Sequence, residues 1–279
     1  MVSPRRRVGV IGLGIMGRPI AMRLLDYGHD VAVLDLEERR ALPLVEAGAR
    51  SGIAAVLEAE VLCVITPDEK PLIEMRDTLS GSSIRTVVLL STVDPASVAD
   101  LEARLKGSGV RLVDAPVSGG AGAARAGSLT ILASGSTEAL DDAAPVLEAL
   151  GDTRRFARVG AASAVKLANQ LALFGALGAL FEGLDLTRAF GVPDEEAVAG
   201  ILASTGRSWG AENLLFFRNL VAEYDEAGTP AEVRPWRKDL RAFAHAASDI
   251  GARAEIVNSL GDSFGDRLEA EARRGEEDE

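Results

Sequence analysis

The segment Arg7-Val8-Gly9-Val10-Ile11-Gly12-Leu13-Gly14-Ile15-Met16-Gly17 decides the fold of this chain. Its first five residues form a short apolar run rich in β-branched side chains, which predicts a buried β-strand from Arg7 to Ile11. The glycines that follow predict a tight turn, and the stretch after them predicts a helix from Met16 to Tyr27. A strand, a glycine-rich turn and a helix in this order are typical of a parallel sheet covered by helices.

The same alternation of β-branched runs and helical stretches continues through the first half of the chain. It predicts further strands at Val31 to Asp35, Val61 to Ile65, Thr86 to Leu90, Arg111 to Ala115, Leu129 to Ala133 and Arg154 to Val159. The helices predicted between these strands include Pro95 to Lys106 and Thr137 to Leu150. The fold class is therefore α/β, with an N-terminal Rossmann-type doubly wound sheet over residues 1–161.

The pattern changes after Val159, where β-branched alternation ends and alanine- and leucine-rich segments begin. Residues 162–279 are predicted to form an all-α C-terminal domain for substrate binding and oligomerisation. A long interdomain helix, about 162–190, should end where Gly191-Val192-Pro193 stops it. Further helices are predicted at Asp194 to Ala203, Gly210 to Tyr224, Pro235 to Ile250 and Ala254 to Arg274.

Small residues on the long helix would let another helix approach closely; they are Gly175, Ala176, Gly178 and Ala179. That second helix would belong either to the same domain or to a second subunit. We therefore expect a homodimer or a homotetramer, and the sequence does not decide between them.

The composition limits the classes of function. The chain has 279 residues, of which 47% are hydrophobic and 26% charged, as in a soluble globular protein. Its net charge of -12 would repel a phosphate backbone, so we expect no nucleic-acid partner. No uncharged apolar stretch reaches the length of about 18 residues that a membrane span needs, so we expect no membrane partner. We expect a cytoplasmic location.

Cysteine and histidine usage argues against disulfides and metal centres. Cys63 is the only cysteine and lies in an apolar run, which predicts a core thiol rather than a reactive one. His29 and His245 are the only histidines, so a site with several histidine ligands is not available, and we expect no metal.

The glycine-rich turn has the arrangement of a dinucleotide-binding site. Gly12 allows the tight turn, Gly14 lets a pyrophosphate approach the backbone, and Gly17 lets the helix pack closely on the strand. The phosphate charge then meets the N-terminus of the helix. The predicted cofactor loop comprises Gly12, Leu13, Gly14, Ile15, Met16 and Gly17.

Asp35, at the end of the second predicted strand, can accept hydrogen bonds from the hydroxyls of the adenosine ribose. A carboxylate there would repel the 2′-phosphate of NADP, so NAD is favoured. Arg39 and Arg40 could instead pair with that phosphate, or they could form a solvated helix face. NADP therefore stays possible.

Four segments together resemble the β-hydroxyacid dehydrogenases, the family that includes 3-hydroxyisobutyrate dehydrogenase and tartronate semialdehyde reductase. They are the cofactor loop, Asp114-Ala115-Pro116-Val117-Ser118-Gly119-Gly120, the stretch from Gly160 to Gln170, and Lys238-Asp239-Leu240. The resemblance spans most of the chain. It implies an oxidoreductase that transfers a hydride between NAD(P) and a small 3-hydroxy acid or its semialdehyde.

The resemblance also implies a substrate-binding segment and a catalytic lysine. Ser118, Gly119 and Gly120 follow a predicted strand end, where consecutive backbone N–H groups can form an anion nest for a substrate carboxylate. Lys166 is one of four lysines in a chain with 26 arginines, and only lysine can release its proton once desolvated. It would act as general acid and base, with a pKa lowered by burial and by neighbouring positive charge.

Asn169 and Gln170 lie three and four residues after Lys166, on the same face of a helix. By the resemblance, one of these amides holds the substrate hydroxyl, and the sequence does not decide which. Thr92 should contact the cofactor near the nicotinamide ribose, and Lys238 should reach it from the helical domain. Ile65, Thr66 and Pro67 would line the adenosine side, while Trp209 would face the substrate pocket or pack in the core.

Two other functions compete with this hypothesis. Imine reductases have a similar architecture but usually lack a lysine at this place, and a non-catalytic dinucleotide-binding scaffold would be expected to lose Lys166. Phosphogluconate dehydrogenase shares the fold, yet it has a far longer helical domain. The identity of the hydroxy acid or semialdehyde and the preferred direction of the reaction stay open.

Overall fold

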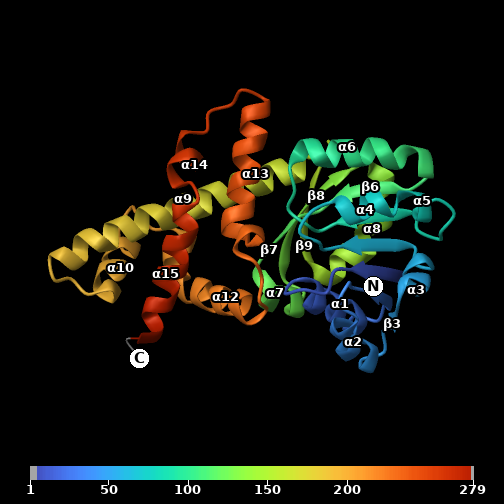
Figure 1. Cartoon of the computed structure of the whole chain (residues 1–279), viewed down its shortest axis with the longest axis horizontal. Helices are drawn as coiled ribbons and strands as arrows, with labels where there is room; N and C mark the ends of the chain where they lie inside the picture. The colour runs from blue at the N-terminus through green and yellow to red at the C-terminus, as the bar shows by residue number, and fades with distance from the viewer. Residues whose placement is uncertain (1–4, 278–279) are drawn as a thin grey trace. The chain divides into compact units, whose positions relative to one another are not determined.

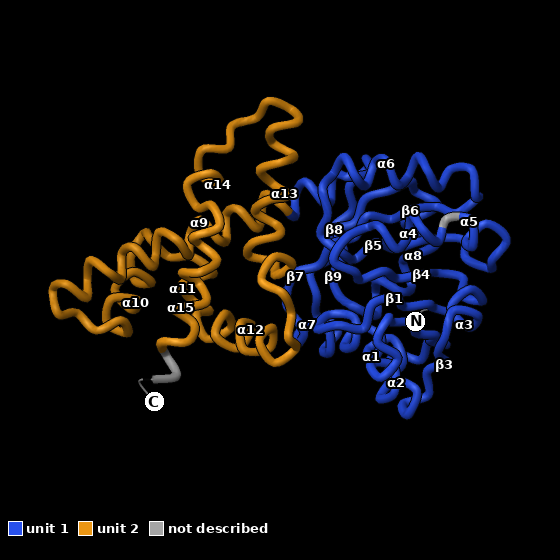
Figure 2. The backbone as a smooth tube through the Cα atoms, in the orientation of Figure 1, with its two compact units in different colours: residues 1–166 blue, residues 167–279 orange. Residues whose placement is uncertain are grey.

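The structure is a computed structural model that describes residues 5–277. The chain divides into two compact units, residues 1–166 (unit 1) and residues 167–279 (unit 2), shown in different colours in Figure 2. The division falls inside helix α9 (Ala161–Ala189), whereas the sequence placed the domain boundary after residue 161.

Unit 1 contains a nine-stranded sheet with the order β3-β2-β1-β4-β5-β6-β8-β7, and β9 pairs with β8. Figure 1 shows strands of this sheet with the helices of unit 1 around them. The strands from β3 to β6 in this order are parallel, while β8 runs antiparallel to β6 and β7. The strands are β1 (Arg7–Ile11), β2 (Asp30–Leu34), β3 (Arg50–Ser51), β4 (Val61–Val64), β5 (Thr86–Leu89), β6 (Arg111–Asp114), β7 (Val117–Ser118), β8 (Leu129–Gly135) and β9 (Gly151–Phe156).

Helices cover both faces of this sheet and bury its apolar side chains. One face packs against α1 (Gly17–Asp26), α2 (Leu42–Glu46), α7 (Gly120–Ala126) and α8 (Thr137–Leu150). The other packs against α3 (Ile53–Leu57), α4 (Lys70–Glu74), α5 (Arg76–Leu79) and α6 (Pro95–Leu105). Cys63 points to the first core and its neighbours Leu62 and Val64 to the second, so both faces of β4 are apolar, as in parallel sheets. The predicted fold class is confirmed.

The connections of the sheet create a switch point beside β1. From β1 the chain runs outward through β2 to β3, then returns to place β4 on the other side of β1. Val8 pairs with Val61 and Ile11 with Val64, so the loops that begin at Gly12 and Ile65 leave the sheet at the same level. Ligands of doubly wound sheets bind beyond such carboxyl ends.

Unit 1 differs from the sequence prediction in several places, among them the short strand β3, which was not predicted. The segment Pro116 to Gly120, for which the sequence predicted no strand, contains β7, whose Val117 and Ser118 pair with Ile131 and Thr130, and α7 begins directly afterwards. The last strand begins at Gly151 rather than Arg154. A Cβ on Gly151 would lie 2.0 Å from the backbone oxygen of Leu129, so only glycine allows β9 to start against β8 there.

Unit 2 is helical. After α9 it contains α10 (Asp194–Leu202), α11 (Trp209–Glu212), α12 (Leu214–Glu226), α13 (Pro235–Asp249), α14 (Glu255–Leu260) and α15 (Ser263–Glu277). Two helices predicted as continuous are each divided, one at Asn213 and the other at Gly261. Gly261 has a φ of +53°, which a continuing right-handed helix does not allow.

Helix α9 supplies much of the core of unit 2. Phe174, Leu177 and Leu184 are buried there with the aromatic side chains Trp236 and Phe264. Among the described residues, α9 is also a helix long and apolar enough to cross a membrane by length and composition, a test that core helices pass as well.

The substitution Leu177→Ala should lower the free energy of unfolding by about 2–5 kcal/mol, because it opens a cavity where the side chain is fully buried. Leu186→Ala is a matched control on the same helix, since Leu186 is 63% exposed. Its effect should stay within about 0.5 kcal/mol. Urea denaturation measures both, and equal losses would contradict this assignment of the core.

Candidate cofactor and active site

The packing of the protein backbone requires two of the glycines in the cofactor loop. Gly12 has a φ of +90°, and a Cβ on it would lie 2.1 Å from the backbone oxygen of Ile65. A Cβ on Gly17 would lie 1.7 Å from the backbone oxygen of Gly12. Side chains at either position would force apart β1, α1 and the loop after β4, so these glycines close the turn and the helix–strand contact.

Gly14 differs from them because the fold does not require a glycine there. A Cβ on Gly14 would meet no protein atom within 4 Å, and the residue is exposed. The bare backbone therefore leaves open space in front of the N-terminus of α1, where the helix dipole favours an anion. This space fits the close approach of a cofactor pyrophosphate.

Asp35 lies directly after β2 and binds the cofactor loop. One carboxylate oxygen accepts a hydrogen bond from the Leu13 N–H at 2.6 Å, and the other accepts from the Glu37 N–H at 2.8 Å. Each oxygen keeps a lone pair for a further donor, such as a ribose hydroxyl. Arg39 and Arg40 form ion pairs with Glu37, and Arg40 also lies 3.7 Å from Asp35.

The neighbouring loops after β4 and β5 are joined by one serine. The Ser91 hydroxyl accepts from the Thr66 N–H at 3.0 Å and donates to the Thr66 carbonyl at 2.7 Å. It therefore links the predicted cofactor segment 65–67 to the loop that carries Thr92. The sequence prediction missed this role, although a polar residue directly after an apolar strand was a usable signal.

Lys166 and Ser118 meet in unit 1. Lys166 is 6% exposed, and its Nζ donates a hydrogen bond to Ser118 Oγ at 2.8 Å. Gly119 follows Ser118 with a φ of +128°, and a Cβ on it would lie 2.6 Å from the Cβ of Ala123, so glycine is required where α7 begins. Gly120 is the first residue of α7. The structure thus joins the predicted proton-transfer group to the predicted substrate-binding segment.

The other predicted polar residues form a separate network within unit 2. Gln170 is buried, and its Nε2 donates to Asp239 Oδ2 at 2.8 Å, while Asp239 Oδ1 pairs with Lys238 Nζ at 3.0 Å. Asn169 is exposed and donates to Gln170 Oε1 at 3.3 Å. Asp239, which was not among the predicted site residues, therefore orients both Gln170 and Lys238. Contact between Lys238 and the cofactor stays a prediction.

Trp209 is neither fully buried nor isolated. It is 51% exposed and makes edge-to-face contacts with the rings of Phe216 and Phe217, at 5.4 and 6.0 Å between centroids. Its contact with substrate stays a prediction.

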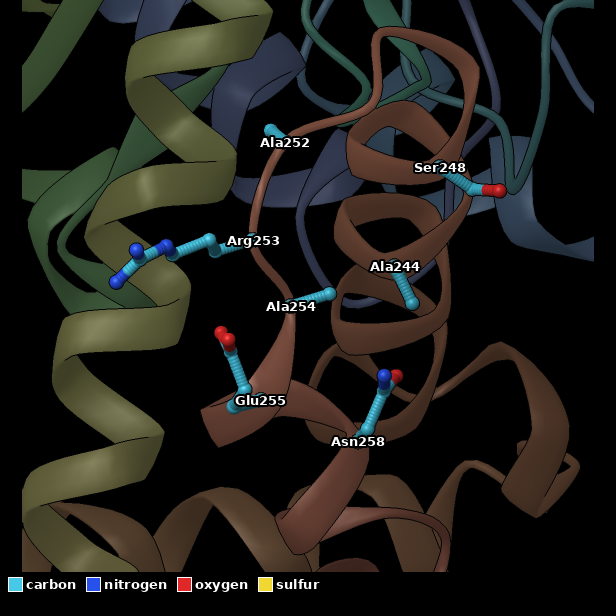
Figure 3. A pocket seen from close by; sticks show the side chains of 7 residues that line it. All are labelled: Ala244, Ser248, Ala252, Arg253, Ala254, Glu255 and Asn258. Carbon is cyan, nitrogen blue, oxygen red and sulfur yellow. The ribbon is translucent and has the colours of Figure 1, made fainter.

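Two other features are not candidate sites. A hollow of about 520 Å³ in unit 2 is formed by α13, α14 and the loop between them, where Arg253, Glu255 and Asn258 are all exposed (Figure 3). None of the predicted site residues lines it. Cys63 is buried, and burial raises the pKa of its thiol to about 12, which confirms that it is a core thiol.

Comparison with known families covers almost the whole chain. Residues 7–160 match the NAD-binding domain of 6-phosphogluconate dehydrogenase, and residues 160–278 match the NAD-binding domain of NADP-dependent 3-hydroxyisobutyrate dehydrogenase. The chain belongs to the β-hydroxyacid dehydrogenase family. This β-hydroxyacid dehydrogenase is an NAD(P)-dependent oxidoreductase that acts on a CH–OH group, and the resemblance seen in the sequence is confirmed.

Individual relatives support the same assignment. The chain is 33% identical to 2-(hydroxymethyl)glutarate dehydrogenase of Eubacterium barkeri, over 74% of this chain and 71% of the relative. It is also 33% identical to 3-hydroxyisobutyrate dehydrogenase of Pseudomonas aeruginosa, over 72% and 71%. A crystal structure of 3-hydroxyisobutyrate dehydrogenase from Salmonella typhimurium is 27% identical and superimposes with a TM-score of 0.77 over 95% of both chains.

Substituting Gly14 and Gly17 separately should distinguish cofactor binding from folding. Gly14→Ala should weaken NAD(P) binding on the order of tenfold while leaving the melting temperature nearly unchanged, because the added methyl occupies only the space meant for pyrophosphate. Gly17→Ala should instead destabilise the fold, because its Cβ would overlap the Gly12 backbone. Calorimetric titration and thermal melting measure the two effects. Unchanged cofactor affinity in the Gly14 variant would contradict the proposed pyrophosphate position.

Proposed function

We propose that this enzyme oxidises a small 3-hydroxy acid, or reduces the corresponding semialdehyde, with Lys166 as the proton-transfer group. The observation that carries the proposal is the hydrogen bond between Lys166 Nζ and Ser118 Oγ. This bond connects a buried lysine side chain to the segment that, by the family resemblance, binds the substrate. When bound, the nicotinamide cofactor supplies or accepts the hydride.

Lys166 would remove the hydroxyl proton during oxidation and return it during reduction. Its burial supports this role, because an ammonium with little contact to water loses a proton more readily than one on the surface. The Ser118 hydroxyl would donate a hydrogen bond to the substrate carboxylate while Lys166 Nζ faces the reacting oxygen. Water exclusion would keep the proton on this path.

Asn169 is the better candidate of the two amides for holding the substrate hydroxyl. Gln170 uses both ends of its side chain within unit 2, because its Nε2 donates to Asp239 and its Oε1 accepts from Asn169. Asn169 is exposed and engages only through its amide nitrogen in that contact. A substrate could therefore bind it without breaking the bond to Asp239.

The substrate class follows from what the named relatives have in common. 2-(Hydroxymethyl)glutarate and 3-hydroxyisobutyrate both carry a hydroxyl on the carbon β to a carboxylate. A panel of such acids, offered with NAD or NADP while the absorbance of the reduced cofactor is followed, tests the proposal directly. Saturable cofactor binding without turnover of any acid would favour a non-catalytic scaffold instead.

Lys166→Met should lower kcat by on the order of a hundredfold or more and leave cofactor affinity nearly intact, because only the proton-transfer group is lost. Lys70→Met is the matched control, since the Lys70 side chain is 75% exposed in its ion pair with Asp68. Steady-state kinetics on both variants measure the difference. Wild-type turnover in the Lys166 variant would rule out the proposed mechanism.

We also propose that NAD is preferred over NADP. One carboxylate oxygen of Asp35 accepts from the cofactor loop and the other from the Glu37 N–H, so its negative charge is fixed at the end of β2. A 2′-phosphate placed there would meet that charge at close range. The nearby Arg39 and Arg40 are already paired with Glu37, which reduces the positive charge they can offer.

Asp35→Asn should weaken the binding of both cofactors, because one of the two backbone N–H groups that Asp35 binds loses its acceptor, but it should weaken the binding of NAD more. The ratio of kcat/KM for NAD to that for NADP should fall by about tenfold. Asp30→Asn is a suitable control, because Asp30 lies at the opposite end of β2 and pairs with Arg50. An unchanged ratio in the Asp35 variant would count against NAD preference.

A further inference from the structure

The first turn of α9 belongs to unit 1, and two of its residues lie in the interior of that unit. Ala162 and Ser163 are both fully buried. The first N–H groups of a helix have no acceptor within the helix, and leaving them unpaired in the interior costs stability. The burial of this turn therefore requires acceptors from elsewhere.

Each of the first four N–H groups of α9 has such an acceptor. Two are backbone carbonyls nearby: Ala161 donates to Arg158 at 3.0 Å, and Ala164 donates to Gly160 at 3.0 Å. The other two are side chains of the sheet, since Ala162 donates to Ser134 Oγ at 3.2 Å and Ser163 donates to Asp114 Oδ2 at 3.0 Å. Strands β6 and β8 thus cap a helix that follows much later in the chain.

Asp114 is the centre of this cap. It is fully buried at the end of β6, and its Oδ1 accepts the Ser163 hydroxyl at 2.7 Å. Ser134 accepts from the Ala162 N–H and so directs its own proton to Asp114 Oδ2, at 3.1 Å. Burial raises the pKa of Asp114, and hydrogen bonds from Ser163, Ser134 and the Gly160 backbone oppose that rise.

The residues of the cap are also close in sequence to both partners of the Lys166–Ser118 hydrogen bond. Lys166 follows Ser163 by three residues, so both side chains project from the same side of α9. Ser118 follows Asp114 along the same short connection from β6 to β7. The position of Asp114 therefore affects both the donor and the acceptor of that 2.8 Å contact.

We propose that Asp114 is a positioning residue for proton transfer: by capping α9 it sets the distance between Lys166 Nζ and Ser118 Oγ. The inference rests on the proposed function of Lys166. If the start of α9 moved by about 1 Å, the hydrogen bond would be lost, and displacements of that size cost enzymes up to a hundredfold in rate. If the cap only stabilised the fold, its loss would not lower kcat while leaving KM for NAD unchanged.

Asp114→Asn tests this role because it keeps the size of the side chain while turning one acceptor oxygen into an NH₂ group that faces N–H and O–H donors. We expect faster amide hydrogen exchange in residues 160–166. We also expect kcat to fall on the order of tenfold to a hundredfold, with KM for NAD within about twofold of wild type. Ser136→Ala is the matched control, because Ser136 caps α8 in the same unit through the Ala139 N–H. It should leave kcat within about twofold.

Ser163→Ala is the milder companion variant, because it removes only the hydroxyl bond to Asp114 and keeps the backbone bond. It should also lower kcat, by a smaller factor than Asp114→Asn. If the Asp114 variant does not fold, the Ser163 variant tests the positioning role by itself. A normal kcat in either folded variant, or a loss no larger than that of Ser136→Ala, overturns the inference.

Failure of the proposed function would be recognised separately. It would appear as wild-type turnover in Lys166→Met, or as no turnover of any hydroxy acid. Faster amide exchange at residues 160–166 in Asp114→Asn would still show that Asp114 caps α9. Unchanged exchange at residues 160–166 in that variant would overturn the inference alone.

Discussion

The buried beginning of helix α9 is the constraint on which the candidate active site depends. A helix that starts inside a protein presents unpaired N–H groups and the positive end of its dipole, and a carboxylate satisfies both. Asp114 meets this requirement at the end of β6. An ionised carboxylate in the interior is itself costly, and the hydroxyl and amide donors around Asp114 oppose that cost.

The sheet imposes a second constraint of the same kind. Because β4 lies beside β1, the Gly12 turn and the loop after β4 are in direct contact. This contact leaves no room for a Cβ on Gly12, and the Gly12 backbone leaves none for a Cβ on Gly17, whereas Gly14 faces open space. The glycine motif thus contains two kinds of glycine. The packing of the protein requires Gly12 and Gly17, but it does not require Gly14.

The sequence predicted the parts of the fold that depend on neighbouring residues. Strands β1, β4, β5 and β6 were located to within one residue at each end, because their apolar runs are continuous and bounded by turns. It did not predict β3 or β7, which have two residues each and form only because a neighbouring strand offers partners. Elements of this length carry almost no local pattern.

The same distinction between local pattern and long-range contact applies to the candidate site. The cofactor loop, Lys166 and the polar groups near them all stand in segments that the sequence singles out, but the contacts between those segments cannot be predicted from neighbouring residues. Ser163 meets Asp114 across 49 positions, and Gln170 meets Asp239 across 69. A serine near the start of a helix or an aspartate after a strand is common, so only the three-dimensional structure distinguishes these from surface residues.

The choice of lysine at position 166 is best understood from its surroundings. Arginine supplies nearly all positive charge in this chain and could also donate a hydrogen bond to Ser118. It would keep its proton at any working pH, however, and its planar fork suits paired acceptors rather than one hydroxyl. The contact of 2.8 Å between Lys166 Nζ and Ser118 Oγ matches a compact ammonium. Burial, the short contact and the residue type therefore all support the proposed proton transfer, whereas charge alone would not require lysine.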